Sequence, residues 1–221
     1  MKNMDKLLTG YSRFHQHHLQ LSDTDTHYQK LLKQDQNPIA IIVGCCDSRV
    51  DPAIILDCDP GDLFVVRNVA NLIPPYENDH HYHGTSAALE FGVRTLNIPN
   101  IIVLGHSECG GIRSLLAKKP SKKGSFIAKW MRLVKIPSAI QMKSYYHLTH
   151  KQKEELYGKK ALMGSLKNLM TFPWIREKVE ANKLHLHAWY FNLSTGSLEE
   201  YDPNTKHFKT LLGKEKREKK K

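Results

Sequence analysis

The stretch Ile39–Pro52, IAIIVGCCDSRVDP, joins an apolar run to a group of reactive side chains. Its first five residues, Ile39–Val43, are all apolar, which is typical of a β-strand buried on both faces. Two thiols, a carboxylate and a guanidinium follow directly after Gly44. The stretch therefore predicts a buried strand whose carboxyl end carries chemistry.

Two later runs have the same apolar character, Leu63–Val66 (LFVV) and Ile101–Leu104 (IIVL), and both are predicted to be strands buried on both faces. The segment between them, Gly84–Leu96 (GTSAALEFGVRTL), has apolar residues at helical spacing, with Thr85 or Ser86 available as its N-cap. Strand, crossover helix and strand in this order predict a parallel sheet.

Helices and a hairpin are predicted around this unit. Apolar residues recur at helical spacing in Met4–Gln20, Tyr28–Lys33, Phe126–Ile136 and Thr149–Met170, and Pro173 fits the first turn of a further helix. Leu184–Pro203 alternates around a turn, as a strand and hairpin at a sheet edge would. We expect an α/β fold with a mainly parallel β-sheet, an antiparallel edge strand and flanking helices. Three regions are expected: a helical N-terminal arm (1–35), the α/β domain (36–212) and a flexible Lys-rich tail (213–221).

Composition limits the classes of partner. The chain has 221 residues, with 33 Lys and Arg against 22 Asp and Glu, a net charge of +11. Much of the excess lies in Lys118–Lys135 and in the tail Lys214–Lys221, and we expect both to be solvated segments. No aromatic residue is interleaved with the lysines of the tail, so we expect no nucleic-acid partner. No run of about 18 apolar residues and no signal-peptide pattern is present, which predicts no membrane partner. The four cysteines are too few and too clustered for a disulfide framework, which favours a cytoplasmic location.

Two of the predicted strands end in the same way, since one runs into Cys45 and the other into His106. Ligands bind beyond the carboxyl ends of parallel strands, so both segments are expected to open onto one crevice. While the chain stays extended, Cys45, Asp47 and Arg49 share a face. In GHSECGG, a tight turn or a first helical turn would bring His106 and Cys109 to one side.

Two thiolates and an imidazole are a ligand set suited to zinc, with a fourth position left for water or for Asp47. Arg49 is near enough to hold Asp47 back through a bidentate ion pair. Other interpretations remain: buried cysteines with a core histidine, a structural Asp47–Arg49 pair, or a redox dithiol, although Cys45 and Cys46 are adjacent rather than spaced Cys-x-x-Cys.

Three stretches together resemble the β-class carbonic anhydrases: GCCDSRVDPAIILDCDPGDLFVVRNVAN (Gly44–Asn71), HGTSAALEFGV (His83–Val93) and IIVLGHSECGGI (Ile101–Ile112). The resemblance implies one zinc ion per subunit on Cys45, His106 and Cys109, and an Asp/Arg dyad at Asp47 and Arg49. It implies reversible hydration of CO2 to bicarbonate and a proton, by attack of zinc-bound hydroxide on CO2. It also implies dimers or multiples of dimers in which helical N-terminal arms embrace the partner subunit.

The resemblance also favours one subclass. Plant-like members carry a glutamine nine residues before the first zinc cysteine, which reaches into the site across the dimer interface, and Gln36 has this spacing. The other subclass has a tryptophan three residues before that cysteine, where this chain has Ile42. We therefore expect an open site with Asp47 held by Arg49.

The resemblance further assigns the substrate pocket. Phe64, Val69 and Phe91 match apolar positions that line it, although Phe91 replaces the tyrosine of plant-like members and core packing would also explain all three. Gly110 and Gly111 would let backbone N–H groups approach an anion at a helix start, although a tight turn alone would explain them.

Two other functions compete with CO2 hydration. A related scaffold could hydrolyse carbon disulfide or carbonyl sulfide, but no entrance-blocking extension is obvious. A structural zinc protein could use its lysine tail to bind nucleic acid or an acidic membrane, which would leave the dyad without a purpose.

The histidines His80, His81 and His83 suit proton transfer by their pKa range, or form an exposed loop.

Overall fold

The computed structural model describes residues 2–20, 25–117, 124–135, 145 and 147–212. The predicted Lys-rich tail (213–221) and most of the Lys118–Ser125 loop lie outside these described residues.

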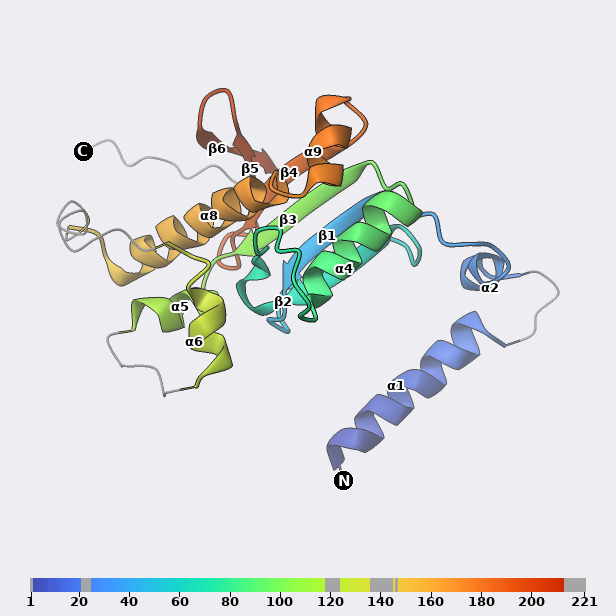
Figure 1. The fold of residues 1–221 in the computed structure, drawn as a ribbon. Coiled ribbons are helices and arrows are strands. Elements are labelled where there is room, and N and C mark those ends of the chain that lie inside the picture. The colour runs from blue at the N-terminus through green and yellow to red at the C-terminus, as the bar shows by residue number, and fades with distance from the viewer. Residues whose placement is uncertain (1, 21–24, 118–123, 136–144, 146, 213–221) are drawn as a thin grey trace.

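A six-stranded sheet forms the centre of the described chain (Figure 1). In spatial order its strands are β2 (Leu63–Asn68), β1 (Ala40–Cys45), β3 (Asn100–His106), β4 (His185–Phe191), β5 (Leu198–Asp202) and β6 (His207–Leu212). The first four are parallel, whereas β5 and β6 are antiparallel to their neighbours. The predicted α/β fold is confirmed, and the antiparallel edge consists of two strands rather than one.

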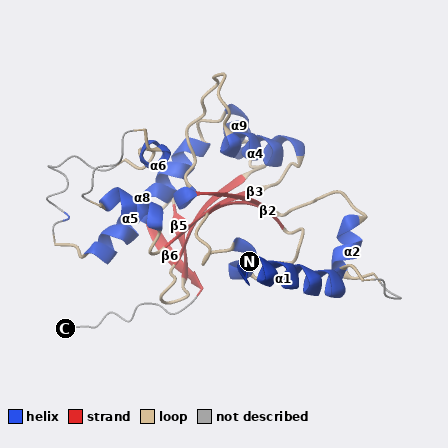
Figure 2. Cartoon of the chain, turned by 90° about the horizontal axis from the view of Figure 1, so that it is seen from below, coloured by secondary structure: helices blue, strands red, loops and turns tan. Residues whose placement is uncertain are grey.

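The two faces of β1 and β3 are both buried, as their continuous apolar runs predict. One face packs against three helical segments: α4 (Gly84–Glu90), continued by the π-helical turn η2 (Phe91–Thr95), α8 (His150–Leu169) and α9 (Pro173–Glu180). Figure 2 shows these helices on one side of the sheet and the N-terminal helix on the other. The main cluster includes Ile41, Val43, Ile101 and Val103 from the strands and Leu89, Leu162 and Ile175 from the helices. Ile42, Ile102 and Leu104 point to the opposite face, where they form a smaller cluster.

Strand β2 departs from the prediction that it is buried on both faces. It is the last strand on its side of the sheet, and the side chain of Val65 is 41% exposed. An apolar run of four residues does not distinguish a central strand from an edge strand, because the neighbouring strands decide how much of it is covered.

The helix signals were correct in two cases and wrong in one. Thr149 caps α8 and forms a capping box with Gln152, and Pro173 is the first residue of α9. Neither Thr85 nor Ser86 caps α4, because this helix already begins at Gly84 and its N-cap is His83, which makes no side-chain cap bond. The hydroxyl of Thr85 instead accepts a hydrogen bond from Asn68 Nδ2 at 3.4 Å.

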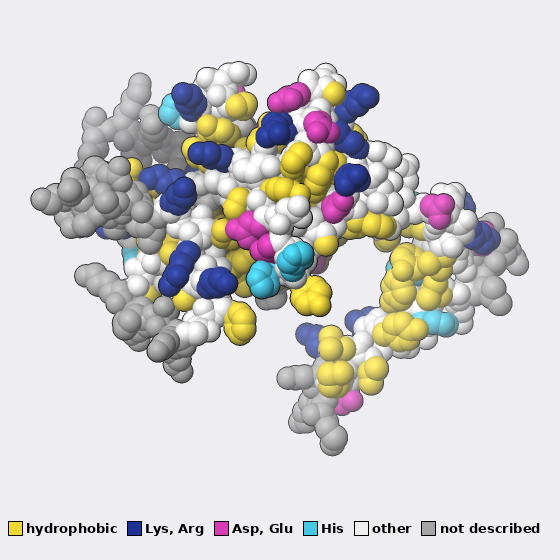
Figure 3. Space-filling view, in the orientation of Figure 1, with side chains coloured by type: hydrophobic (Ala, Val, Ile, Leu, Met, Phe, Trp, Pro, Cys, Tyr) yellow, Lys and Arg dark blue, Asp and Glu magenta, His cyan; other side chains and the backbone are white. Residues whose placement is uncertain are grey.

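The N-terminal helices α1 (Lys2–His18) and α2 (His27–Leu32) stand away from the sheet (Figure 1). They contact each other through the rings of Phe14 and Tyr28, whose centroids are 5.1 Å apart. Leu7, Leu8 and Tyr11 on α1 are each more than 60% exposed, and Figure 3 shows hydrophobic side chains along this arm. The arm therefore presents apolar surface that the described chain itself does not cover.

The other helices of the described residues are short and lie near the carboxyl ends of the strands or in their connections: α3 (Pro52–Leu56), the 3-10 turn η1 (Val69–Asn71), α5 (Gly110–Leu116) and α6 (Phe126–Met131). Among the described residues, no helix has both the length and the apolar character needed to cross a bilayer.

Candidate metal centre

The loop after β1 positions the first group of candidate residues. Cys45 is the last residue of β1 and is buried, whereas the side chain of Cys46 is exposed. The chain then turns, with the amide of Val50 donating to the carbonyl of Asp47 at 3.1 Å. Arg49 thus folds back onto Asp47 through a turn, and not through the extended chain that sequence reasoning assumed.

The loop after β3 positions the second group. His106 ends β3, and Cys109 is the N-cap of α5. Between them, Glu108 has a φ of 60°, so a tight turn brings the two ligands to one side. Ser107 fixes this turn, since its amide donates to Phe191 O at 2.9 Å and its hydroxyl accepts from the amide of Leu193 at 2.9 Å.

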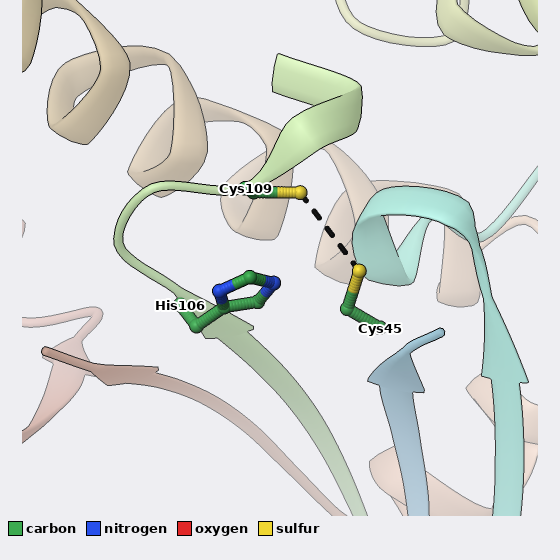
Figure 4. Close-up of side chains that lie close together, drawn as sticks. All are labelled: Cys45, His106 and Cys109. Carbon is green, nitrogen blue, oxygen red and sulfur yellow. Dashed lines mark hydrogen bonds between the residues drawn. The ribbon is translucent and has the colours of Figure 1, made fainter. Parts of the chain in front are cut away.

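Cys45, His106 and Cys109 converge between the two strand ends (Figure 4). One ligand atom from each residue lies within 4.8 Å of the other two, and all three residues are buried. Parallel pairing of β1 with β3 brings both strand ends to the same edge of the sheet. The two segments therefore meet at one edge of the sheet, as predicted.

The chemistry of these three donors fits a divalent zinc ion. The sulfur atoms of Cys45 and Cys109 are 3.8 Å apart, and two sulfurs bound tetrahedrally at about 2.3 Å from zinc would also be about 3.8 Å apart. His106 Nδ1 is 2.8 Å from the carbonyl oxygen of Ser107, which only accepts, so Nδ1 carries the proton. The lone pair of Nε2 is then free, and this buried atom has no hydrogen-bond partner in the described part of the chain. An orphaned buried nitrogen beside two thiols is the pattern that a metal ion would satisfy.

The contact between the two thiols divides their proton affinities. The hydrogen bond from Cys109 lowers the pKa of the Cys45 thiol, whereas the contact with Cys45, together with burial, raises the pKa of Cys109. A single proton between two sulfurs produces this split, because two adjacent thiolates repel each other without a cation. A bound divalent cation would allow both to ionise.

Asp47 and Arg49 form a bidentate ion pair beside the ligands. Asp47 Oδ1 accepts from the backbone amide and from Nε of Arg49, both at 3.0 Å, and Oδ2 accepts from Nη2 at 2.8 Å. These hydrogen bonds hold the pKa of the Asp47 carboxyl well below its usual range. The carboxylate is thus charged and directed at Arg49.

The predicted pocket residues lie at the β2 edge of the sheet. The rings of Phe64 and Phe91 are stacked with centroids 6.1 Å apart. Phe91 is 43% exposed and Val69 is 37% exposed, so the described residues of one chain do not enclose these two side chains.

The two glycines at the start of α5 differ in their surroundings. A Cβ atom on Gly111 would lie 2.9 Å from Cβ of Ala70 and 3.0 Å from Cγ1 of Val69, so close packing requires a glycine there. A Cβ atom on Gly110 would have no neighbour within 4 Å among the residues that the structure describes. Packing therefore explains Gly111, while Gly110 is open at the helix start.

Gln36 lies four residues before β1, at the end of the strand away from Cys45, and is exposed. Strand β1 thus separates it from the metal ligands of its own chain.

His80 and His81 are exposed, and His83 Nε2 lies 2.6 Å from Asp79 Oδ1. Glu77, Asp79 and His83 also bring potential metal ligands together, but at the exposed surface.

The sequence did not predict the roles of two residues beside the metal centre, Arg67 and Glu108. Arg67, on β2, donates to the carbonyls of Cys45 (2.9 Å) and Asp47 (2.7 Å) and to Asp51 Oδ2 (2.9 Å), so it clamps the loop that carries the dyad. An arginine directly after the apolar run LFVV was the available signal. Glu108 contacts Arg49 through both its carbonyl and its carboxylate. The position of Glu108 between His106 and Cys109 in the sequence did not indicate a contact with Arg49.

A sequence model of the carbonic anhydrase family matches residues 40–198 of this chain. Among the similar proteins is the chloroplastic β carbonic anhydrase 5 of Arabidopsis thaliana, which is 40% identical over 83% of this chain. The chain spans 60% of that relative's length, and 59% of the length of a mitochondrial β carbonic anhydrase from the same plant. The plant proteins are therefore considerably longer than this chain.

Solved structures agree with the sequence matches. The β-carbonic anhydrase CcaA is 30% identical and superposes with a TM-score of 0.80 over 98% of this chain and 94% of its own. One of two tetrameric β-carbonic anhydrases from Sordaria macrospora is 25% identical, with a TM-score of 0.67 over 96% of each chain.

Proposed function

This chain belongs to the β-class carbonic anhydrase family, and from that premise we propose that it catalyses the reversible hydration of CO2 to bicarbonate and a proton. The observation that carries the proposal is the buried group of Cys45, His106 and Cys109, with an unpartnered Nε2 and a sulfur separation that fits zinc. One zinc ion per chain is the proposed cofactor.

The three ligands have distinct parts in this site. Cys45 and Cys109 would supply negative charge, and His106 would supply the Nε2 lone pair that the Ser107 carbonyl directs by fixing the proton on Nδ1. Zinc held by three protein ligands lowers the pKa of a water in its fourth position to about 7, which supplies a nucleophile at neutral pH.

The Asp47–Arg49 pair is proposed to keep the fourth position free. All hydrogen bonds of the Asp47 carboxylate described above run to Arg49. To bind the metal, Asp47 would have to give up this bidentate pair. The loop is stiffened against such a movement by Arg67, which binds the backbone on both sides of Cys46.

Phe64, Val69 and Phe91 are proposed to receive CO2, which is apolar and needs no hydrogen-bond donor. The backbone N–H groups of Gly110 and Gly111 are proposed to face the bicarbonate anion, with the open side at Gly110. Because the pocket residues are partly exposed in one chain, a second subunit would have to complete the pocket.

Self-association is therefore part of the proposal. The arm (1–35) would cover a partner subunit, which is supported by its exposed apolar side chains and by the tetrameric state named for the Sordaria macrospora relative. Gln36 would reach the partner's site and donate a hydrogen bond to bicarbonate. We also propose a cytoplasmic location, for which the free thiols of all four cysteines are the supporting observation.

Stopped-flow measurement of CO2 hydration, on protein with quantified zinc, tests this function. We expect activity at neutral pH that is lost in Cys45→Ser. Activity only at alkaline pH would refute the open site but keep the reaction. A zinc-loaded protein without activity at either pH would refute the proposed reaction.

A further inference from the structure

Glu108 occupies a backbone conformation that is unfavourable for its residue type. Its φ of 60° lies in the left-handed region, which glycine and asparagine adopt more readily than glutamate. Such strain persists where the surrounding structure compensates for it, and it is concentrated at functional sites. The side-chain contacts of Glu108 show what this compensation is.

The carboxylate of Glu108 lies between the dyad and two other elements. Its Oε2 is 3.6 Å from Arg49 Nη1, and its carbonyl oxygen accepts from Arg49 Nη2 at 3.3 Å. Its Oε1 lies 3.7 Å from Lys151 Nζ on α8 and accepts from the hydroxyl of Ser194 at 3.4 Å. Lys151 also donates to Ser194 at 3.2 Å, which closes the group.

Arg49 is therefore bound on two sides. Asp47 takes the edge formed by Nε and Nη2, while the Glu108 carboxylate faces Nη1. Both carboxylates can be bound together because a guanidinium has five N–H donors. With Lys151, the group contains two cations and two anions, so Glu108 need not draw Arg49 away from Asp47.

The contact of Glu108 with Arg49 matters because Arg49 is exposed. Its side chain is 50% accessible to solvent, and an exposed ion pair is weak since water screens it and a long side chain loses entropy in forming it. Asp47 alone would restrain Arg49 weakly. A carboxylate on the other side of the guanidinium reduces the conformations that Arg49 can adopt, so less entropy is lost when it binds Asp47.

We infer that Glu108 is a positioning residue that fixes Arg49 against Asp47, and thereby sets how completely Asp47 is kept from the metal's fourth position. This inference rests on the proposed function and adds a determinant of the open site that lies outside the dyad. It acts through Arg49 and requires no contact between Glu108 and substrate.

Two substitutions separate this role from a structural one. Glu108→Gln keeps the size of the side chain and removes its charge. Glu108→Gly removes the carboxylate and also relieves the left-handed backbone. Glu180→Gln is the matched control, because it removes an exposed carboxylate from α9.

Crystal structures of the zinc-loaded wild type and variants give the first measurement. We expect Asp47 to leave Arg49 and occupy the metal's fourth position in a fraction of the Glu108→Gln and Glu108→Gly molecules. Asp47 remaining fully paired with Arg49 in both variants would overturn the inference. This result is independent of turnover, so a wild type that fails to hydrate CO2 would refute the proposed function without deciding the inference.

Kinetics and stability give the second measurement. In both variants kcat should fall about twofold to fivefold, the size expected for the loss of an exposed ion pair. KM should not change, because Asp47 on the metal would not fill the apolar pocket, and the zinc content should also be unchanged. The unfolding temperature of Glu108→Gly should not fall, and Glu180→Gln should match wild type in both kinetic constants. A lower unfolding temperature with unchanged kcat in both Glu108 variants would mean that Glu108 only holds the loop together, and would also overturn the inference.

Discussion

Alanine substitutions at two adjacent glycines, Gly110 and Gly111, should have opposite effects on the free energy of unfolding. A Cβ atom at position 111 would lie 2.9 Å from Cβ of Ala70, 3.0 Å from Cγ1 of Val69 and 3.3 Å from Sδ of Met131. Ala70 has a φ of 63°, so its Cβ can retreat only if a left-handed backbone moves with it. A Cβ atom on Gly110 meets no atom of the described chain within 4 Å.

The expected size follows from two opposing terms. Alanine in place of a helical glycine contributes about 0.5–1 kcal/mol of stability, because the unfolded chain loses freedom and the helix propensity rises. Overpacking a tight site costs about 1–3 kcal/mol. Gly110→Ala gains only the first term, so it should be slightly more stable than wild type, and Gly111→Ala should be less stable than Gly110→Ala by about 1–3 kcal/mol. For a chain of this length, 2 kcal/mol corresponds to about 4–8 °C in Tm.

Thermal unfolding of the two zinc-loaded variants at equal protein concentration is the assay, since self-association makes Tm depend on concentration. Equal stability of Gly111→Ala and Gly110→Ala would refute the steric explanation of Gly111. Anion binding and a tight turn, the two explanations that the sequence offers, would then remain for this position.

Three further predictions concern the metal, the arm and the second hairpin. Removal of zinc by a chelator should lower Tm and zinc should restore it, because His106 Nε2 and the two buried thiols lose their common partner; a Tm that does not respond to zinc would contradict the metal site. Deletion of residues 1–35 should shift the protein toward monomers in light scattering, because the exposed apolar side chains of α1 are removed; an unchanged oligomer would exclude the arm as its main contact. The pKa of Asp202 is lowered to about 2, chiefly by a hydrogen bond from Lys209, so its contribution to stability is complete above the unfolded pKa of about 3.9 and is lost as the pH falls toward 2. Lys209→Gln should therefore be less stable than wild type at pH 7, and urea unfolding should show this difference shrinking between about pH 4 and pH 2; a difference independent of pH would refute this.

Apolar runs and capping residues predicted those strands and helices whose formation depends mainly on nearby residues. The apolar residues Ala40–Val43 and Ile101–Leu104 lie in strands buried on both faces, whereas Ile39, the first residue of the predicted run, precedes β1 and is 61% exposed. Thr149 caps the long helix α8, as predicted. The cap of α4 was misjudged because several polar residues at its start could serve, and Asn68, which binds Thr85, is distant in the sequence.

Position in the sheet was not predictable in the same way. Leu63–Val66 reads like a central strand, and only the order of the strands makes β2 an edge with Val65 exposed. A run of residues records its own hydrophobicity, while its coverage depends on neighbours from other parts of the chain.

Short segments of sequence were sufficient to predict the α/β class and the residue types of the metal centre, because hydrophobic periodicity and ligand spacing are properties of short segments. How these segments meet depends on the folded chain. Parallel pairing of β1 with β3 brings Cys45 and Cys109 to 3.8 Å across 64 residues of sequence. It also surrounds Arg49 with Asp47 on one side and Glu108 on the other. Contacts of this kind depend on the relative placement of distant loops, and hydrophobic pattern carries no information about that placement.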